Sequence, residues 1–188
     1  MRVIAGKFKG RRLYAPASLV VRPALGKVKG AIFNILANRV EGSRVLDLFA
    51  GTGSIGIEAL SRGALKCDFV ENHREVLKAL DKNLQNCQVE SESKILPMPV
   101  SEALPLLKRR GERYDLIFFD PPYDQAWITK ILPLLGEGSW SCNGSTLVVE
   151  HSPREIVQSG YGCWQLCDER VYGQTRIGFF EQGKEVSV

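Results

Sequence analysis

The sequence predicts an α/β fold with a mostly parallel sheet, helices on both of its faces and an antiparallel hairpin near its carboxyl end. Between residues 44 and 150, short apolar runs alternate with segments of helical period, as in parallel strands joined by helices. Further along, Trp164–Val171 and Thr175–Glu181 have the pattern of two strands joined across Tyr172-Gly173-Gln174. Together these patterns predict a sheet that ends in antiparallel strands.

Length and composition are those of a single globular domain, with room for a short extension. The chain has 188 residues, of which 44% are hydrophobic and 24% are charged. No apolar run approaches the ~20 residues that cross a bilayer. The first seven residues lack the apolar core of a signal peptide. We therefore expect a cytoplasmic protein without a membrane partner.

Cysteine and histidine usage indicates neither a metal site nor disulfides. The five cysteines, at positions 67, 87, 142, 163 and 167, are odd in number and form no C-x-x-C pair. Cys67 lies in a predicted strand and Cys163 and Cys167 flank another, so reduced, buried thiols in cytosol are expected. His73 and His151 show no ligand spacing.

The first 42 residues are expected to form a separate extension. Residues 1–15 suggest a short strand or hairpin with Gly6 and Gly10 as turn residues, and residues 20–23 are extended because they lead into a proline. A helix is expected over 27–38, with its apolar face at Val28, Ile32, Ile35 and Leu36. The loop at 41–43 then divides the chain into an extension, 1–42, and a main domain, 43–188.

The main domain alternates strands and helices. Strands are expected at 44–49, 67–71, near 94–99, 115–119 and 145–150, with helices at 54–61, 73–86, 101–110 and 125–135. In such sheets ligands bind beyond the carboxyl ends of the strands. Polar residues that follow these strands are therefore the candidates for a site.

One of these strand ends carries Asp120-Pro121-Pro122-Tyr123, directly after the apolar run Leu116–Phe119. Prolines can continue neither a sheet ladder nor a helix, so they form a rigid turn. The carboxylate of Asp120 and the turn carbonyls can accept hydrogen bonds from an amino group, and Tyr123 offers a flat face for stacking. The motif predicts a site that holds the exocyclic amine of a nucleobase.

Another strand end leads into a glycine-rich turn. Asp47 lies at the end of the strand, and Gly51 and Gly53 precede a helix whose free N–H groups face the turn. The stretch matches G-x-G-x-x-G, which alone is a weak signal. An acid beside the turn disfavours a pyrophosphate and suits a cationic ligand. S-adenosylmethionine, with its sulfonium and ammonium groups, fits this pattern.

The next strand ends at Glu71, 18 residues after Gly53. An acid at this position can accept hydrogen bonds from both ribose hydroxyls of a nucleoside. The alternative is that Glu71 only caps the helix that follows. Because Asp47, Glu71 and Asp120 all end neighbouring strands, we expect them to line one cleft.

Positive charge is concentrated at the start of the chain. Residues 1–40 carry nine basic and no acidic side chains, whereas the rest carries 16 basic and 21 acidic ones. Such an arm is typical of a phosphate-backbone partner, although a basic run can also be a solvated tail. Apolar residues interleave with the charges, which favours a folded nucleic-acid surface. The candidate contacts are Lys7, Lys9, Arg11, Arg12 and Arg22.

These motifs resemble those of class I S-adenosylmethionine-dependent methyltransferases, specifically the bacterial small-subunit (16S) ribosomal RNA (guanine-N2)-methyltransferases. The resemblance covers nearly the whole chain. It is carried by residues 1–13, Val21-Arg22-Pro23, Ala31–Leu36, Asp47–Gly53, Glu58–Ala64 and Asp120–Tyr123, in the family's order. The last motif is shared with adenine and glutamine N-methyltransferases, and the amino-terminal stretch narrows the resemblance to the ribosomal group.

The resemblance implies a Rossmann-like, seven-stranded sheet whose final strand is inserted antiparallel. It implies that Asp47, Gly51 and Gly53 contact the methionine part of the cofactor and that Glu71 contacts its ribose. Phe49, inside the same motif, is included in the cofactor site. Glu102 stands where the family usually has Asp or Asn near the adenine. The chain also departs from the family at residues 24–30, which lack a hydroxyl and two acids.

The expected reaction is transfer of a methyl group to the N2 amine of a guanine. The Asp120 carboxylate and the Pro121 carbonyl would each accept a hydrogen bond from one N–H group of the amine. Tyr123 would stack on the base. Ribosomal RNA or a small-subunit particle is the expected partner, and such an enzyme needs no second protein chain, so a monomer is expected.

Three alternatives share parts of this pattern. A DNA or RNA adenine-N6 methyltransferase would use the same cleft, but a DNA enzyme's usual target-recognition domain has no room in 188 residues. A non-catalytic RNA-binding or assembly factor would not need the full acid and glycine set. A dinucleotide-dependent oxidoreductase is disfavoured by Asp47 and by the proline turn.

Overall fold

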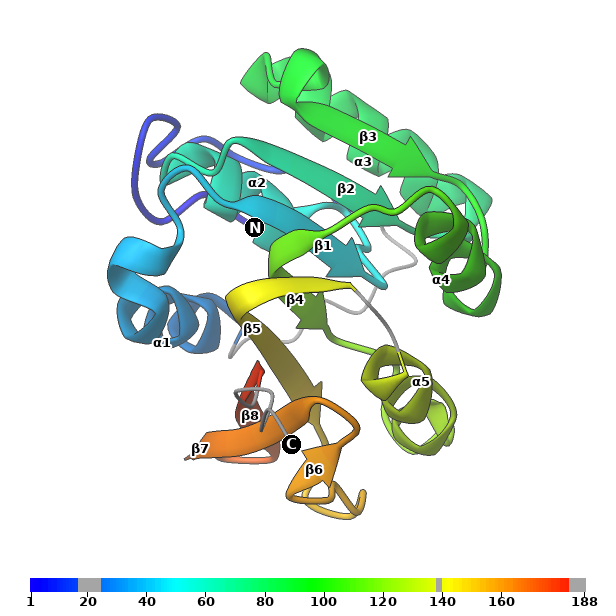
Figure 1. Cartoon of the computed structure of the whole chain (residues 1–188). Helices are drawn as coiled ribbons and strands as arrows, with labels where there is room; N and C mark the ends of the chain where they lie inside the picture. The colour runs from blue at the N-terminus through cyan, green and yellow to red at the C-terminus, as the bar shows by residue number, and fades with distance from the viewer. Residues whose placement is uncertain (17–24, 138–139, 183–188) are drawn as a thin grey trace.

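The described residues form one mixed sheet of eight strands, in the order β3-β2-β1-β4-β5-β8-β7-β6 (Figure 1). The computed structural model describes residues 1–16, 25–137 and 140–182. The strands are β1 Arg44–Leu48, β2 Lys66–Val70, β3 Ser93–Leu96, β4 Tyr114–Phe119, β5 Ser141–His151, β6 Gly160–Tyr161, β7 Trp164–Tyr172 and β8 Thr175–Gln182. The α-helices are α1 Leu25–Leu36, α2 Ser54–Ser61, α3 Arg74–Cys87, α4 Val100–Arg109 and α5 Trp127–Gly136.

The two faces of the sheet bury two hydrophobic clusters, as expected for strands covered on both sides. Alternate residues of β1 and β4, such as Val45 and Phe118, pack with α1, α2 and α3. The residues between them, such as Leu46 and Phe119, pack with α4 and α5. The sheet is therefore the middle of three layers, and its carboxyl edge lies between the helices of both faces.

The predicted fold class is confirmed. The strands β1 to β5 pair in parallel, and the last strand, β8, is inserted antiparallel between β5 and β7. In the part of the chain that the structure describes, the sheet has eight strands rather than the seven that the resemblance implied, because the two-residue β6 pairs with the start of β7. Helix α2 has the predicted bounds, and the other predicted elements of the main domain are found within a few residues of their expected ends.

Helix α1 differs from expectation in the face it buries. Val28, Ile32 and Leu36 are buried as predicted, but Ile35 is 39% exposed. Phe33 and Lys29 are buried instead, and Lys29 is only 2% exposed. The buried face of α1 includes Lys29 because its ammonium group contacts Ser54 and Glu58 of α2. Hydrophobic periodicity does not reveal such a contact.

The first 14 residues fold against α2 and α3 (Figure 1). The expected hairpin is reduced to one antiparallel bridge, Arg2 with Arg12, because several of its N–H groups bond to α2. Lys7 N donates to the Ser61 carbonyl at 2.7 Å. Gly6 has φ +78°, and a Cβ there would lie 1.8 Å from that same carbonyl oxygen, so only glycine fits this approach.

The amino-terminal segment shares the core of the main domain. Val3, Phe8 and Leu13 are buried in the cluster that includes α1, α2 and α3. The predicted division of the chain after residue 42 stays a prediction. Residues on both sides of it contribute to this shared core. The predicted extended stretch at 20–23 lies outside the described residues. In the parts of the chain that are described, no helix is long and apolar enough to cross a membrane.

Candidate active site

The strands β1, β2 and β4 end at the same level on the carboxyl edge of the sheet, and β5 passes that level and ends two residues further on, at His151. Leu48, the last residue of β1, pairs with Val70 on one side and with Phe119 on the other. Phe119 pairs in turn with Val149 of β5. The next residue of each strand is therefore Phe49, Glu71, Asp120 or Glu150. The register brings three predicted site residues, from β1, β2 and β4, to one rim.

The carboxylate of Asp47 lies beneath the glycine turn. Its Oδ2 accepts a hydrogen bond from Gly56 N at 2.9 Å, and the residue is 2% exposed. Gly53 caps α2 with φ +81°, and a Cβ there would lie 2.6 Å from Leu80 Cδ1. The turn is thus held by a buried acid below and by close packing against α3. In this arrangement Asp47 is bonded to the first turn of α2 and is closed off from the open surface.

Burial raises the pKa of Asp47 to about 7, against the hydrogen bond from Gly56, and the nearby charge of Glu71 adds to the increase. The two carboxylates are therefore close enough to repel one another. A positive group between or beside them would relieve that repulsion, whereas a phosphate would increase it.

Glu71 joins the end of β2 to the glycine turn. Its Oε2 accepts a hydrogen bond from Gly51 N at 3.0 Å, and its Oε1 accepts from the backbone N–H groups of Asn72 and His73, each at 2.8 Å. The side chain thus binds backbone at the entrance to α3, as in the capping alternative. It is also half-buried at the rim, and its role toward a ribose stays a prediction.

Phe49 has a backbone conformation that few side chains adopt, with φ +59°. Its ring packs against Phe119 at 5.8 Å and edge-on against Trp127 at 5.0 Å between centroids. The ring therefore connects the glycine turn with the strand that leads to Asp120. Strained residues are often found at functional sites, and Asp124 and Ala126, beside the proline turn, also have positive φ.

The proline turn is anchored through Tyr123. The hydroxyl donates to Glu150 Oε1 at 2.7 Å, and the Thr175 hydroxyl oxygen lies 3.0 Å away. Glu150 and Thr175 are both 8% exposed, while Asp120 and the Tyr123 ring are half-buried at the rim. These contacts fix the hydroxyl end of Tyr123 and thereby anchor the proline turn to β5 and β8.

Glu150 and Thr175 were not among the predicted site residues. Glu150 follows the apolar run Leu147–Val149, so the strand-end rule that singled out Asp120 would also have found it. Thr175 is the first residue of β8, a strand near the carboxyl end of the chain that pairs antiparallel with β5. Nothing in the local pattern of the sequence places it beside Tyr123.

Glu102 lies in the first turn of α4 and is exposed. It follows β3 by way of Pro97, Met98 and Pro99, and the last residue of β3, Leu96, pairs with Val70 of β2 at the level of the rim. The structure places Glu102 on the helix rather than at the strand end itself, and its role toward an adenine stays a prediction.

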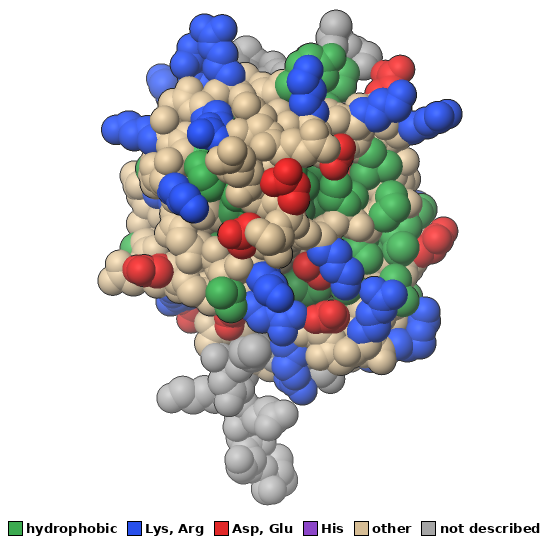
Figure 2. All heavy atoms as spheres, turned by 90° about the horizontal axis from the view of Figure 1, so that it is seen from above, with side chains coloured by type: hydrophobic (Ala, Val, Ile, Leu, Met, Phe, Trp, Pro, Cys, Tyr) green, Lys and Arg blue, Asp and Glu red, His purple; other side chains and the backbone are tan. Residues whose placement is uncertain are grey.

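Most of the predicted nucleic-acid contacts are exposed. Lys7, Lys9 and Arg12 project from the amino-terminal segment, whereas Arg11 is half-buried and donates to the Asn86 carbonyl of α3. Arg22 lies outside the described residues. On the face seen in Figure 2, Lys and Arg side chains lie mainly around the margin, with Asp and Glu side chains between them. Basic surface is therefore available, but this face carries both signs of charge.

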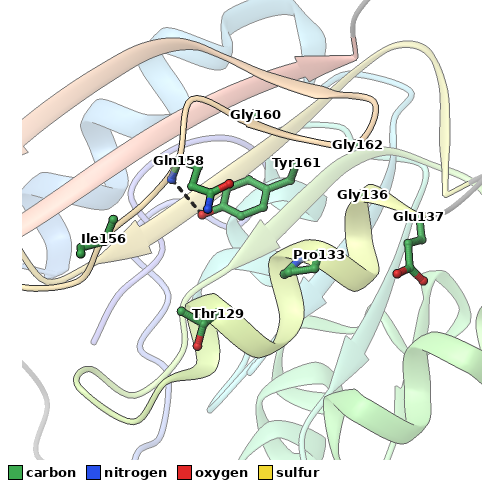
Figure 3. A pocket seen from close by; sticks show the side chains of 9 residues that line it. All are labelled: Thr129, Pro133, Gly136, Glu137, Ile156, Gln158, Gly160, Tyr161 and Gly162. Atoms are coloured by element: carbon green, nitrogen blue, oxygen red, sulfur yellow. Dashed lines mark hydrogen bonds between the residues drawn. The ribbon is translucent and has the colours of Figure 1, made fainter.

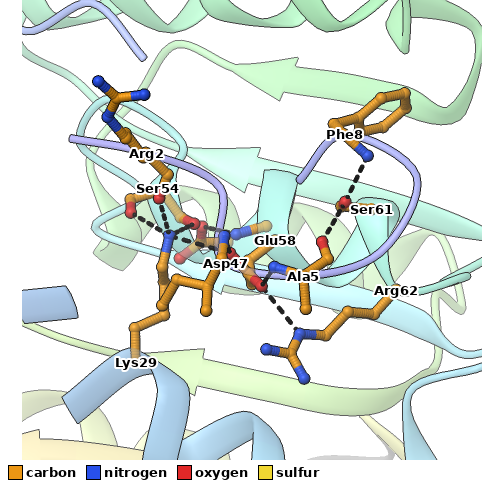
Figure 4. A network of polar contacts seen from close by, with 11 residues as sticks. Arg2, Ala5, Phe8, Lys29, Asp47, Ser54, Glu58, Ser61 and Arg62 are labelled. Carbon is orange, nitrogen blue, oxygen red and sulfur yellow. Dashed lines mark hydrogen bonds and ion pairs between the residues drawn. The ribbon is translucent and has the colours of Figure 1, made fainter. Parts of the chain in front are cut away.

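A buried ionic network fixes α2 between α1 and the amino-terminal segment (Figure 4). The carboxylate of Glu58 is fully buried and lies 3.1 Å from Lys29 Nζ and 2.8 Å from Arg62 Nε. It also accepts hydrogen bonds from the backbone N–H groups of Ile4 and Ala5. Burial opposes its ionisation, but these partners hold the pKa of Glu58 below its ordinary value. Burial lowers the pKa of Lys29, and Glu58 opposes that shift.

The same lysine reaches the start of α2, where its Nζ lies 3.1 Å from Ser54 Oγ. The network is therefore attached to the helix that carries the glycine turn. Its residues were not predicted as functional, because a lysine within an apolar helical period gives no signal of burial.

A separate cavity of about 590 Å³ lies between α5 and β6 (Figure 3). The Tyr161 ring forms one wall, with its hydroxyl accepting from Gln158 N at 2.9 Å, and Thr129 and Pro133 of α5 form another. None of the predicted site residues that the structure describes lines it.

In the described parts of the chain, no group of three or more His, Cys, Asp and Glu side chains could hold a metal ion. The described cysteines are free thiols. Cys67 is buried as expected and Cys87 is buried as well, but Cys163 is only half-buried and Cys167 is exposed, so the expected burial of Cys167 is wrong.

The sheet order and the glycine turn define a Rossmann-like methyltransferase fold. The solved structure "Putative methyltransferase yhhF from Escherichia coli" matches it with a TM-score of 0.84 and 29% identity, covering 97% of both chains. The chain belongs to the family described as Conserved hypothetical protein 95, whose model matches residues 1–181.

Two relatives carry the name Ribosomal RNA small subunit methyltransferase D. The protein from Haemophilus influenzae is 36% identical over 175 residues, which span 92% of this chain and 89% of the relative. The protein from Escherichia coli K12 is 30% identical over 182 residues, spanning 97% and 90%. The similarity therefore extends over nearly the whole length of both proteins.

Proposed function

We propose that this protein transfers a methyl group from S-adenosylmethionine to the exocyclic N2 amine of a guanine in small-subunit ribosomal RNA. The observation that carries the proposal is the shared level of the strand ends, which brings Phe49, Glu71 and Asp120 to one rim. The names of the relatives support ribosomal RNA as the substrate. The guanine N2 atom is inferred from the resemblance and from the acceptor groups of the proline turn.

The residues of the glycine turn fit a cationic nucleoside. Asp47 and Glu71 place two interacting carboxylates beneath and beside the turn. A Cβ on Gly51 would meet only the Phe49 carbonyl oxygen, at 3.9 Å, so the backbone there is open to close approach. Glu71 would hold the ribose hydroxyls, and the turn would hold the methionine part. When bound, this cofactor supplies an electrophilic methyl group on a positively charged sulfur.

Asp120 and the Pro121 carbonyl would orient the amine. The lone pair of a guanine N2 atom is delocalised into the ring, so the amine is a weak nucleophile. If both N–H groups donate hydrogen bonds to these acceptors, a tetrahedral nitrogen is favoured. Its lone pair is then less delocalised into the ring and is directed at the sulfonium methyl group. The main contribution is then positioning, and no strong base is needed before attack, because the nitrogen becomes acidic only once it is alkylated.

Tyr123 would stack on the guanine, a contact worth roughly 1–3 kcal/mol. Its hydroxyl is held by Glu150 and Thr175, so the ring would need little reorganisation on binding. A base in a helix must leave its stack to reach such a rim. An anchored aromatic ring offers that base a new stacking partner.

The test is incubation with labelled S-adenosylmethionine and, in separate reactions, small-subunit ribosomal RNA, assembled small-subunit particles and duplex DNA. We expect label in RNA or particles and none in DNA. Digestion to nucleosides should then show N2-methylguanosine. Label in N6-methyladenosine would favour the adenine enzyme, and absence of transfer to every polynucleotide would contradict the proposal.

A further inference from the structure

A pocket of about 570 Å³ lies between the amino-terminal segment and α3. Arg12 and Tyr14 form one wall, and Lys82 and Asn86 of α3 form the other. None of the described residues that line it is acidic. Its size is in the range of small-ligand sites, and its charge is positive in a chain whose later residues carry more acids than bases.

An aromatic face and two cations meet in this pocket. Tyr14 is 51% exposed, although large aromatic rings are usually buried. The Lys82 ammonium lies 4.6 Å from the centroid of its ring, and the Arg12 side chain is exposed beside it. An exposed ring flanked by cations has the chemistry to stack a base and hold its phosphate.

The pocket is connected to the glycine turn through Asn83, which is 1% exposed. Its Nδ2 donates to the carbonyls of Tyr14 and Thr52, each at 2.9 Å, and its Oδ1 accepts from Tyr14 N at 2.7 Å. Thr52 lies between the two glycines of the turn. The backbone of Tyr14 is thus fixed next to the cofactor loop by bonds that do not involve its own side chain.

We propose that this pocket holds a nucleotide of the RNA substrate outside the reaction cleft, with its base on Tyr14 and its phosphate at Arg12 and Lys82. The inference rests on the proposed function, since it assumes that RNA is the partner. It extends that function to a second binding site between the amino-terminal segment and α3, which joins Arg12 of the predicted basic arm to Tyr14 and Lys82, two residues that were not predicted as contacts. Exposed Lys7 and Lys9 on the same segment favour a polynucleotide over a free nucleotide.

Three substitutions test the pocket against one matched control. Tyr14→Ala removes the ring but keeps the backbone bonds to Asn83, Tyr14→Phe keeps the ring, and Lys82→Glu reverses the charge. Lys66→Glu makes the same charge change at an exposed position at the start of β2, away from the carboxyl edge. Binding of a fluorescent small-subunit ribosomal RNA transcript is measured by anisotropy at several salt concentrations, and cofactor binding by calorimetry.

We expect Tyr14→Ala to weaken RNA binding about tenfold with an unchanged salt dependence, because stacking carries no charge. Lys82→Glu should weaken it about tenfold and reduce the salt dependence. Tyr14→Phe and Lys66→Glu should stay within about threefold of the wild type, and cofactor affinity should not change in any variant. Thermal unfolding of each variant shows that it is folded.

The two proposals fail in different ways. If Tyr14→Ala and Lys82→Glu bind RNA like the wild type, the pocket proposal is wrong, even where the wild type methylates that RNA. A wild type that binds RNA through Tyr14 and Lys82 but transfers no methyl group would contradict the proposed function and leave the pocket standing. Competition by adenosine 5′-monophosphate without any effect of the variants on RNA binding would assign the pocket to a free nucleotide and overturn the proposal.

Discussion

The two halves of the rim use their acidic side chains in different ways. In the glycine-turn half, Asp47 and Glu71 accept hydrogen bonds from backbone N–H groups of Gly56 and Gly51. In the proline-turn half, Glu150 accepts from the side chain of Tyr123. The first half is therefore a scaffold in which carboxylates hold loops. The second depends on side chains from separate strands, so changes there should alter the reaction more than the fold.

Asp120→Ala gives the sharpest test of this difference. We expect turnover to fall by about 10³-fold, by analogy with the loss of one polar group that stabilises a reacting atom, while cofactor affinity changes less than threefold. Steady-state kinetics with RNA and calorimetry with S-adenosylmethionine measure the two quantities. Asp81→Ala, at an exposed position of α3, is the matched control. An equal loss of cofactor affinity would place Asp120 in the cofactor site instead.

Glu58→Gln tests the scaffold beneath the glycine turn. Removing the charge leaves Lys29 buried without its carboxylate partner, and breaking such a pair costs about 3 kcal/mol of unfolding free energy or more. Urea denaturation followed by circular dichroism measures the loss. Glu112→Gln, which breaks the exposed pair with Arg44, should cost at most about 1 kcal/mol. Equal costs for the two variants would mean that the buried network contributes little.

Asp47→Asn separates the structural and ionic roles of the buried acid. The raised pKa, about 7 against an ordinary 3.8, means that the folded protein binds more protons than the unfolded chain between these values. The stability that the protonated Asp47 contributes is therefore present below pH 3.8 and is lost as the pH rises through about 7. Asparagine keeps an oxygen for Gly56 N but cannot ionise.

We therefore expect the wild type to lose on the order of 2 kcal/mol more unfolding free energy than Asp47→Asn between pH 5 and pH 8. Urea denaturation at both values measures it, with Asp81→Asn on the exposed side of α3 as the control. A cationic cofactor should favour the ionised acid, so wild-type affinity should rise over the same range more steeply than that of the variant. Parallel pH curves would show that Asp47 is ionised throughout.

The strand ends were predictable from the sequence, whereas the partners of their side chains were not. Apolar runs that stop at Glu71 and Asp120 identify the rim, since parallel strands end at a common edge. The same runs do not predict that the Asp47 side chain lies beneath the glycine turn, because the position of its partner Gly56 depends on the packing of α2. Lys29 and Thr175 reach the site from elements distant in sequence, and their contacts exist only once the helices and the carboxyl-terminal hairpin have packed.

Tyr123→Phe gives the smallest expected effect and tests how far the proline turn depends on its anchor. The variant keeps the ring for stacking but loses the hydroxyl that contacts Glu150 and Thr175. We expect unfolding free energy to fall by about 1 kcal/mol, as for one partly buried hydrogen bond, and turnover to fall several-fold with unchanged cofactor affinity. Tyr172→Phe, on β7, is the control for loss of a hydroxyl. If Tyr123→Phe instead lowered cofactor affinity, the two halves of the rim would be coupled through the aromatic contact of Phe49 with Phe119, and the division between scaffold and reacting side chains would not hold.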